Sequence, residues 1–268
     1  MKKKKTFIII LLLVAFLAYF SFNFVAVHAD SGFDTSFDSG GFDSDWDSSG
    51  GGGSGDPIVT LIIIIIVIIV CIVQAKKHKE LMEKMKQESL ALSEKIKQEI
   101  PEFVHDAFLK MAYQIYLDTQ DAWMNFNYDK LRSLLSDELY NSYVSQLKTL
   151  SVKKQKNVMN SFNLVHNFIT YYEKTEKEYV IKTETCVTFY DYIVDKNNKI
   201  VRGNNQNRVT NTYELTFVRS ISKKSNKCPN CNAPLSNSGS NVCEYCNSVI
   251  VNNNHDWIMS KKENKRQR

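Results

Sequence analysis

The stretch that decides the architecture of this chain is IVTLIIIIIVIIVCIV, residues 58–73, in which Thr60 is the only polar side chain and no residue is charged. As an α-helix this stretch would be about 24 Å long at about 1.5 Å per residue, slightly less than the apolar thickness of a bilayer, about 30 Å. The residues that follow, including the apolar stems of two lysines, can cover the difference. A buried core helix or a pair of core strands is the alternative. The density of isoleucine and the different characters of the two flanks favour a transmembrane helix over residues 58–75.

The N-terminal residues have the parts of a secretory signal peptide. Four lysines at positions 2–5 precede an apolar run over residues 7–20, and Val27 and Ala29 are small residues at the two positions that a signal peptidase reads. The sequence therefore predicts a signal peptide over residues 1–29. An uncleaved first membrane span is the alternative.

Residues 30–57 are rich in aspartate, glycine and serine, and four aromatic residues are each followed by aspartate. With almost no aliphatic side chains, this segment cannot bury enough apolar surface to offset the entropy lost on ordering. We therefore expect a disordered external segment. Asp43, Asp45 and Asp47 alternate like the start of a calcium-binding loop, but the bend glycine and the closing glutamate are missing, so no metal site is predicted there.

The charges around the apolar stretch predict its orientation. Residues 2–5 carry four positive charges, residues 30–73 carry seven negative charges, and residues 74–268 carry a net charge of +8. Because lysine-rich flanks stay on the cytoplasmic side, we expect a single-pass protein of the cell membrane with an extracytoplasmic N-terminal segment and a cytoplasmic C-terminal domain. A basic region next to a membrane span indicates an anionic membrane surface as a partner before nucleic acid.

Residues 76–100 predict a juxtamembrane amphipathic helix that continues from the span. Lysine and glutamate surround a stripe of apolar residues at steps of four and seven, and Pro101 closes the pattern. The stripe consists of Leu81, Met85, Leu92, Ile96 and Ile100. The stripe can pack on the protein's own domain, lie on a lipid surface or pair with a second copy in a coiled coil.

Residues 101–260 predict one compact domain that begins with three helices. Pro101 suits a first helical position, and apolar residues follow at helical spacing to about residue 126. Asn127 or Asp129 can cap a second, short helix, and Ser136 can cap a third.

After the basic residues 153–156, the period of the apolar residues changes to two, which is typical of strands. The first strand is predicted to place on one face Phe162, Leu164, His166 and Phe168. Strands are also expected at about 179–194, 200–202 and 208–219, and a last strand starts at Trp257 and Ile258, before a basic tail over residues 261–268. The apolar faces of the two long strands consist of Ile181, Val187, Phe189, Ile193, Val209, Tyr213, Leu215 and Phe217. Helices followed by an antiparallel meander predict an α+β fold.

Four of the six cysteines form two CxxC pairs separated by eleven residues rich in asparagine, serine and glycine. The pairs are Cys228–Cys231 and Cys243–Cys246. Four thiolates that converge tetrahedrally suit Zn²⁺ or a mononuclear iron, and we predict a structural zinc ribbon over residues 225–252. Disulfides are the alternative, which a cytoplasmic location disfavours. The other two cysteines, Cys71 and Cys186, are most simply apolar filling residues.

The segment FVHDAFLKMAYQIYLDTQDAWMNFNYDKLRSLLSDELYNSY, residues 103–143, resembles the domain shared with the motor-tethering subunit of the mitochondrial inner-membrane translocase, the translocase-forty-four-like (TIM-forty-four-like) family. Bacterial membrane proteins of this family resemble the chain further, with a signal, a glycine-rich segment, one span and an inserted CPxC…CxxC ribbon followed by an Asp-Trp pair, here Asp256-Trp257. The resemblance implies a cone-shaped, nuclear-transport-factor-two-like α+β domain, with three helices on a curved antiparallel sheet around an apolar pocket. It also implies membrane attachment and translocase partners. Knuckles of this type usually place glycine where this chain has Asn232 and Asn247, and asparagine tolerates the left-handed conformation better than most residues.

Three functional hypotheses follow. The first is a non-enzymatic, membrane-tethered module that binds a membrane-protein or translocase partner or a lipid acyl chain, in protein translocation or envelope maintenance. The second is a pocket enzyme that uses His166, Tyr190 or Asp191. Tyr190 and Asp191 lie on opposite faces of one strand, and no nucleophile or paired-carboxylate motif appears, so no catalytic residue is predicted. The third is nucleic-acid binding through the ribbon and the tail, which the lack of basic and aromatic residues in the ribbon disfavours. The oligomeric state stays open.

Overall fold

The computed structural model describes residues 57–221, 228, 230–231, 233–234, 243–248 and 257–265. The predicted signal peptide (1–29) and nearly all of the predicted external segment lie outside the described residues. The chain divides into two units. The first unit includes the first part of a long N-terminal helix. The second unit includes the rest of that helix and the whole of the α+β domain.

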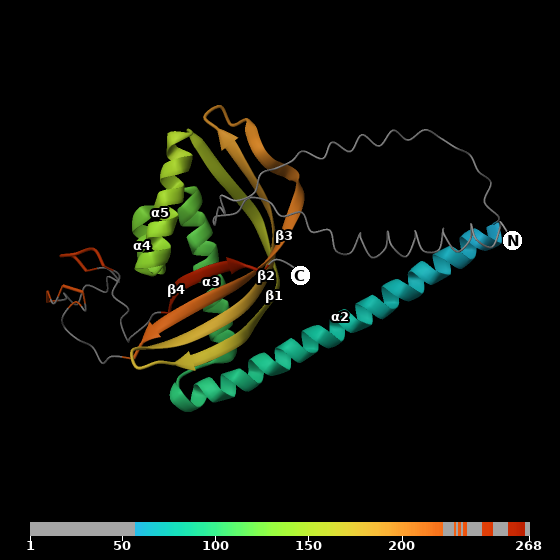
Figure 1. The fold of residues 1–268 in the computed structure, drawn as a ribbon, viewed down its shortest axis with the longest axis horizontal. Helices are drawn as coiled ribbons and strands as arrows, with labels where there is room; N and C mark the ends of the chain where they lie inside the picture. Colours follow the sequence, from blue (N-terminus) through green and yellow to red (C-terminus); the bar gives the residue numbers. More distant parts are fainter. Residues whose placement is uncertain are drawn as a thin grey trace. The chain divides into compact units, whose positions relative to one another are not determined.

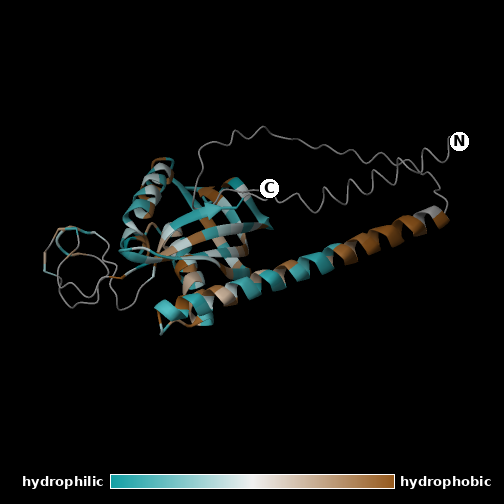
Figure 2. Cartoon of the chain, turned by 60° about the horizontal axis from the view of Figure 1, so that its bottom comes forward, coloured by the Kyte–Doolittle hydropathy of each residue, from teal (hydrophilic) through white to brown (hydrophobic). Residues whose placement is uncertain are grey.

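The helix α2, Pro57–Glu99, contains both the predicted span and the predicted amphipathic segment. Its N-terminal half is a continuous apolar run, and polar residues dominate the half that follows (Figure 2). Within the described residues, α2 is the one helix that is long and apolar enough to cross a membrane. The predicted helices at 58–75 and 76–100 are therefore confirmed as one continuous helix.

Three shorter helices begin the domain: α3 (His105–Met124), α4 (Tyr128–Leu134) and α5 (Asp137–Val152). The predicted caps are confirmed, because the Asn127 side chain accepts a hydrogen bond from the Lys130 N–H and the Ser136 hydroxyl accepts one from the Leu139 N–H. The prediction that α3 begins at Pro101 is wrong. The chain makes a turn there instead, and the helix starts four residues later, because its preceding residue Val104 is still extended.

The second half of the domain is a four-stranded antiparallel sheet in the order β1-β2-β3-β4. The strands are β1 (Gln155–Lys174), β2 (Glu178–Asp195), β3 (Ile200–Ser220) and β4 (Ile258–Asn264). The sheet curves, and α3, α4 and α5 lie on one of its faces (Figure 1). We call this the inner face and the opposite one the outer face. The predicted α+β fold class is confirmed.

The core fills the space between the three helices and the inner face. The apolar residues predicted for β2 and β3 are all buried, and all but Ile193 belong to this core. Aromatic side chains dominate, as in the stacked pair Phe162–Phe189 and the edge-on pair Trp123–Tyr143, whose ring centroids are 5.0 and 5.1 Å apart. Such pairs contribute about 0.5–1.5 kcal/mol each beyond the burial of their surface.

The predicted apolar face of β1 is confirmed at Phe162, which packs on the core, and is wrong for the residues that follow it. The register against β2 shifts three times, between Asn160 and Asn163, between Leu164 and His166, and between Ile169 and Tyr171. Because each extra residue turns the following side chains to the other face, the inner positions of this part of β1 are taken by Asn167, Ile169 and Tyr172, which are buried. Leu164 is 38% exposed.

The ends of the last two strands also differ from the prediction. The two strands predicted at 200–202 and 208–219 are one strand, β3, that starts at Ile200. The residues after Asn204 form an irregularity, and β3 pairs with β2 both before and after it. β4 continues to Asn264, so the first half of the predicted basic tail is an edge strand, with Leu215 opposite Lys262.

The last turns of α2 pack on the domain. Ile96 and Ile100 are fully buried in the main core, and Ser89 is buried as well. The Ser89 hydroxyl accepts a hydrogen bond from the Ile169 N–H of β1 and lies 2.9 Å from Nε2 of His105 on α3. For residues 89–100, the first of the three alternatives, packing on the protein's own domain, is therefore observed.

Candidate metal centre and outer sheet face

The four ribbon cysteines converge. The thiol sulfurs of Cys228, Cys231, Cys243 and Cys246 all lie within 4.8 Å of one another. Two pairs come closer, with Cys228 Sγ 3.6 Å from Cys246 Sγ and Cys231 Sγ 3.7 Å from Cys243 Sγ. A tetrahedral site with metal–sulfur bonds of about 2.3 Å requires sulfurs about 3.8 Å apart. The sulfurs are far beyond the disulfide bond length of about 2.05 Å, so the four cysteines are free thiols in this structure and their geometry fits a four-thiolate metal site.

Each knuckle is built by backbone hydrogen bonds. The Cys228 N–H donates to the carbonyl of Ala233, and the Cys243 N–H donates to the carbonyl of Ser248. The Asn247 N–H donates a hydrogen bond to the Cys243 carbonyl, and Asn247 adopts a left-handed conformation with a φ of 55°. Asparagine therefore takes the place of the usual glycine, as the sequence predicts. Asn232 lies outside the described residues.

The electrostatics of the cluster call for a cation. Hydrogen bonds from the Ser248 hydroxyl and backbone lower the pKa of Cys246 to about 6. At Cys231 the backbone hydrogen bond from Ala233 acts in the same direction, but desolvation and the hydrogen bonds with the other three thiols together raise the pKa to about 12. Four thiolates this close repel one another, and a divalent metal ion bound among them would stabilise every one through its charge.

The two remaining cysteines do not join this group. Cys71 is exposed on the apolar half of α2, and Cys186 is buried on β2. Burial raises the pKa of the Cys186 thiol, although a hydrogen bond with Thr212 acts against it.

The three candidate catalytic residues do not converge. Asp191 lies on the inner face, is 1% exposed, and its Oδ1 accepts a hydrogen bond of 2.7 Å from the Asn157 amide. Tyr190 lies on the outer face, with the guanidinium of Arg208 5.3 Å from its ring centre. The prediction of His166 on an apolar face is wrong, because the shifts of register in β1 place it on the outer face near a carboxylate of β2.

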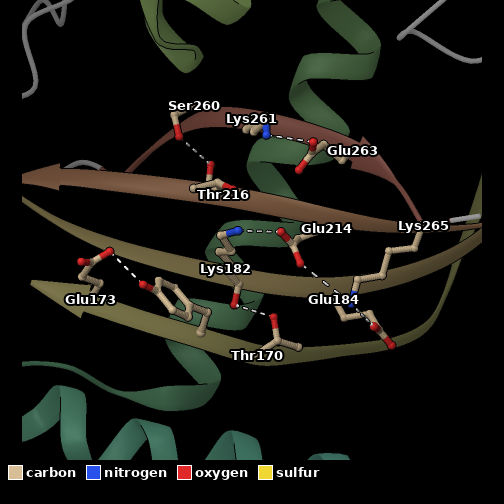
Figure 3. A network of polar contacts seen from close by, with 11 residues as sticks. Thr170, Glu173, Lys182, Glu184, Glu214, Thr216, Ser260, Lys261, Glu263 and Lys265 are labelled. Atoms are coloured by element: carbon tan, nitrogen blue, oxygen red, sulfur yellow. Dashed lines mark hydrogen bonds and ion pairs between the residues drawn. The ribbon is translucent and has the colours of Figure 1, made fainter. Parts of the chain in front are cut away.

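The outer face carries a network of ion pairs across the strands (Figure 3). Glu184 lies at its centre, with His166 Nε2 3.4 Å from one carboxylate oxygen and Lys265 Nζ 2.6 Å from the other. Lys265 is also 3.9 Å from Glu214, and Glu214 binds Lys182 at 2.8 Å. These pairs join residues of different strands. Sequence reasoning missed the network, although alternating charges in the strand sequences were a signal for it.

The network controls the ionisation of its central residue. The nearby His166 imidazole, followed by Lys265, lowers the pKa of Glu184 to about 2 against the opposing effect of burial. Glu184 therefore stays charged over the whole physiological range, and the network is a structural feature of the folded sheet.

Comparison with known proteins identifies the domain. The model of a family described as Tim44-like domain matches residues 89–228, more than half of the chain. No curated protein matches. The match begins at Ser89, the first residue of α2 that is buried, and ends at the first ribbon cysteine, so most of the ribbon and β4 lie beyond it. The resemblance noted in the sequence is confirmed, and the chain belongs to the Tim44-like domain family.

Proposed function

We propose that this protein is a membrane-anchored, non-enzymatic module that binds or tethers a partner in protein translocation or envelope maintenance. The observation that carries the proposal is the continuity of α2. One helix contains the long apolar run and, with its last turns, is buried in the core of the Tim44-like domain. A partner bound to the domain is thereby held near a membrane.

The charge distribution supports an orientation with the domain in the cytoplasm. Lysines follow the apolar run directly, and aspartates precede it, which favours the lysine side as the cytoplasmic one. The cytoplasm keeps thiols reduced, as the four-cysteine cluster requires. We infer that the cluster binds a structural Zn²⁺, because four thiolates leave no open coordination position for a substrate.

The placement of the candidate acid–base groups favours binding over catalysis. His166 and Asp191, the two most plausible acid–base groups, lie on opposite faces of the sheet, so they cannot act on one substrate. The partner classes that suit the domain are a membrane or translocase protein and a lipid acyl chain.

Cysteine labelling and crosslinking test the proposal. Ser36→Cys and Asn141→Cys variants of the full chain, each in intact cells, would be treated with a membrane-impermeant maleimide, with the unmodified chain as control for the native thiols. We expect labelling of the first variant in intact cells and of the second only after lysis. Crosslinking followed by mass spectrometry should then recover membrane-protein partners. Labelling of Asn141→Cys in intact cells would overturn the orientation.

A further inference from the structure

The positive charge of the domain is concentrated at one end of the sheet. Residues 148–156 and 195–208 contain eight lysines and arginines and one aspartate, a net charge of +7, whereas the whole of residues 74–268 carries +8. We call these eight residues the basic end: Lys148, Lys153, Lys154, Lys156, Lys196, Lys199, Arg202 and Arg208. The rest of this part of the chain is therefore almost electrically balanced.

The fold brings these residues together from one helix, two strands and the two turns between them. α5 ends at Val152, β1 begins three residues later, and Gln155 of β1 lies opposite Asp195, the last residue of β2. On the other side of β2, Ile193 pairs with Arg202 of β3. The end of α5, the start of β1 and the turn from β2 to β3 thus form one end of the domain (Figure 1). The last turns of α2 lie at the opposite end, where Glu99 binds Lys174 at 2.6 Å.

The six lysine charges of the basic end are available. All eight side chains are exposed, and the six lysines have no carboxylate at ion-pair distance among the described residues. The local carboxylate, that of Asp195, accepts hydrogen bonds from the backbone N–H groups of Asn197 and Lys199 and is used to form the turn. The outer face differs, because Lys182 and Lys265 are paired with glutamates there.

We propose that the basic end is a docking surface for an acidic polypeptide segment of a partner protein. The negative charge of such a segment is complementary to the positive charge of the basic end. The large apolar side chains exposed at this end are two valines, Val152 (84% exposed) and Val201 (47% exposed). Single-stranded nucleic acid is bound on exposed aromatic rings. Of the two tyrosines near these cations, Tyr190 is already covered by Arg208 and Tyr192 is partly buried. Insertion into a membrane interface uses tryptophan, phenylalanine or leucine, none of which is exposed at this end.

This inference rests on the proposed function in that it names the class of partner. Its test is independent of membrane orientation. The full chain in nanodiscs of zwitterionic lipid would be titrated with a fluorescent deca-glutamate peptide, and binding followed by anisotropy at low ionic strength and at about 0.15 M. We expect salt-sensitive binding that weakens at least about tenfold when Lys153, Lys156, Lys196 and Lys199 are together replaced by glutamine, since each exposed ion pair contributes a fraction of a kcal/mol.

A matched control removes four charges elsewhere. Lys86, Lys97, Lys110 and Lys177 are exposed and lie outside the basic end. Their joint replacement by glutamine should leave peptide binding unchanged, and unaltered urea unfolding would show that both variants are folded. Equal loss of binding in both variants, or no loss in the first, overturns the proposal. Stronger binding of the basic end to oligo-thymidine or to phosphatidylglycerol vesicles than to the peptide overturns the assignment of a protein partner. A domain found on the outside of the cell would overturn the proposed function and leave this binding measurable.

Discussion

At the scale of single residues, the carboxylate of Glu184 has the clearest electrostatic role. It is 16% exposed and lies between His166 and Lys265. Its pKa in the folded protein, about 2, is below the ordinary value of 4.5. The stabilisation is therefore fully present above pH 4.5 and is lost as the pH falls from about 4.5 to about 2.

Replacing Glu184 by glutamine tests this pH dependence. We expect the free energy of unfolding to fall by about 1–2 kcal/mol at pH 7, less than the full shift of pKa implies because solvent screens the pairs. The difference from the unmodified protein should shrink between pH 4.5 and pH 3, as measured by urea unfolding. Glu173→Gln is the control, because the Glu173 carboxylate is exposed and accepts a hydrogen bond from the uncharged hydroxyl of Tyr171. A Glu184→Gln effect that stays constant over this range contradicts the assignment.

Gly203 is a second residue whose identity the fold requires. Its φ is +77°, and a Cβ there would lie 2.5 Å from the Asp191 carbonyl oxygen and 2.8 Å from the Tyr192 Cα, both backbone atoms of β2. We expect Gly203→Ala to destabilise the domain by at least about 2 kcal/mol. Asn198, in the turn between β2 and β3, provides a control in the opposite direction, because its φ of 59° is one that glycine adopts more readily than asparagine. Asn198→Gly should be neutral or slightly stabilising in the same unfolding measurement.

At the scale of elements, the joint between α2 and the domain combines the buried Ile96 and Ile100 with one buried hydroxyl, that of Ser89. The Ser89 oxygen accepts the hydrogen bond of the Ile169 N–H, a buried donor of the edge strand β1. Ser89→Ala leaves this donor unpaired, which should cost about 1–3 kcal/mol. Hydrogen exchange should become faster in the last turns of α2 and in the middle of β1.

Ser93 provides the matched control for this joint. It is also buried, but its hydroxyl donates to the Ser89 carbonyl within α2 and bonds to no residue of the sheet in the described part of the chain. Ser93→Ala should therefore cost less than about 1 kcal/mol and leave hydrogen exchange in β1 unchanged. Equal effects of the two replacements would show that the Ser89 hydroxyl has no special role in docking.

At the scale of the whole molecule, the metal site and the domain core should unfold separately. The ribbon lies in the connection from β3 to β4. A metal ion bound by the four cysteines would roughly halve the length of flexible chain that joins the two strands. Halving the length of a loop changes the entropic cost of closing it by only about 0.6 kcal/mol. β4 is held independently by the buried Trp257, Ile258 and Met259, each of which contributes about 1.5–3 kcal/mol.

Metal removal tests this separation. Chelation, or the double replacement Cys228→Ser and Cys243→Ser, should abolish zinc binding measured by mass spectrometry and expose the remaining thiols. The urea midpoint of the domain, followed by the fluorescence of the buried Trp123 and Trp257, should shift by less than about 1 kcal/mol of unfolding free energy. Cys186→Ala, outside the cluster, should leave the metal content unchanged. Collapse of β4 on metal loss would contradict the separation.

The sequence by itself determined the features that depend on neighbouring residues. The apolar run and its flanks predicted a helix over 58–75, Asn127 and Ser136 marked helix starts, and the CxxC spacing identified the four cysteines that converge. Each depends on interactions within a few residues, so the pattern along the chain contains the necessary information. The alternation in β2 and β3 was equally readable, because an unbroken strand keeps the same face inward.

Only the tertiary structure decided which side chains of β1 face the core and which charges pair. The shifts of register in β1 placed His166 beside Glu184 and left Leu164 at the surface. The pattern of neighbouring residues in the sequence does not predict such shifts. Ile169, a partner of Ser89, and Lys265, a partner of Glu184, are 80 and 81 residues away in the sequence. The charges of the basic end likewise come from two separate segments, 148–156 and 195–208. Their proximity follows from the packing of helices on a curved sheet, which is a property of the whole fold.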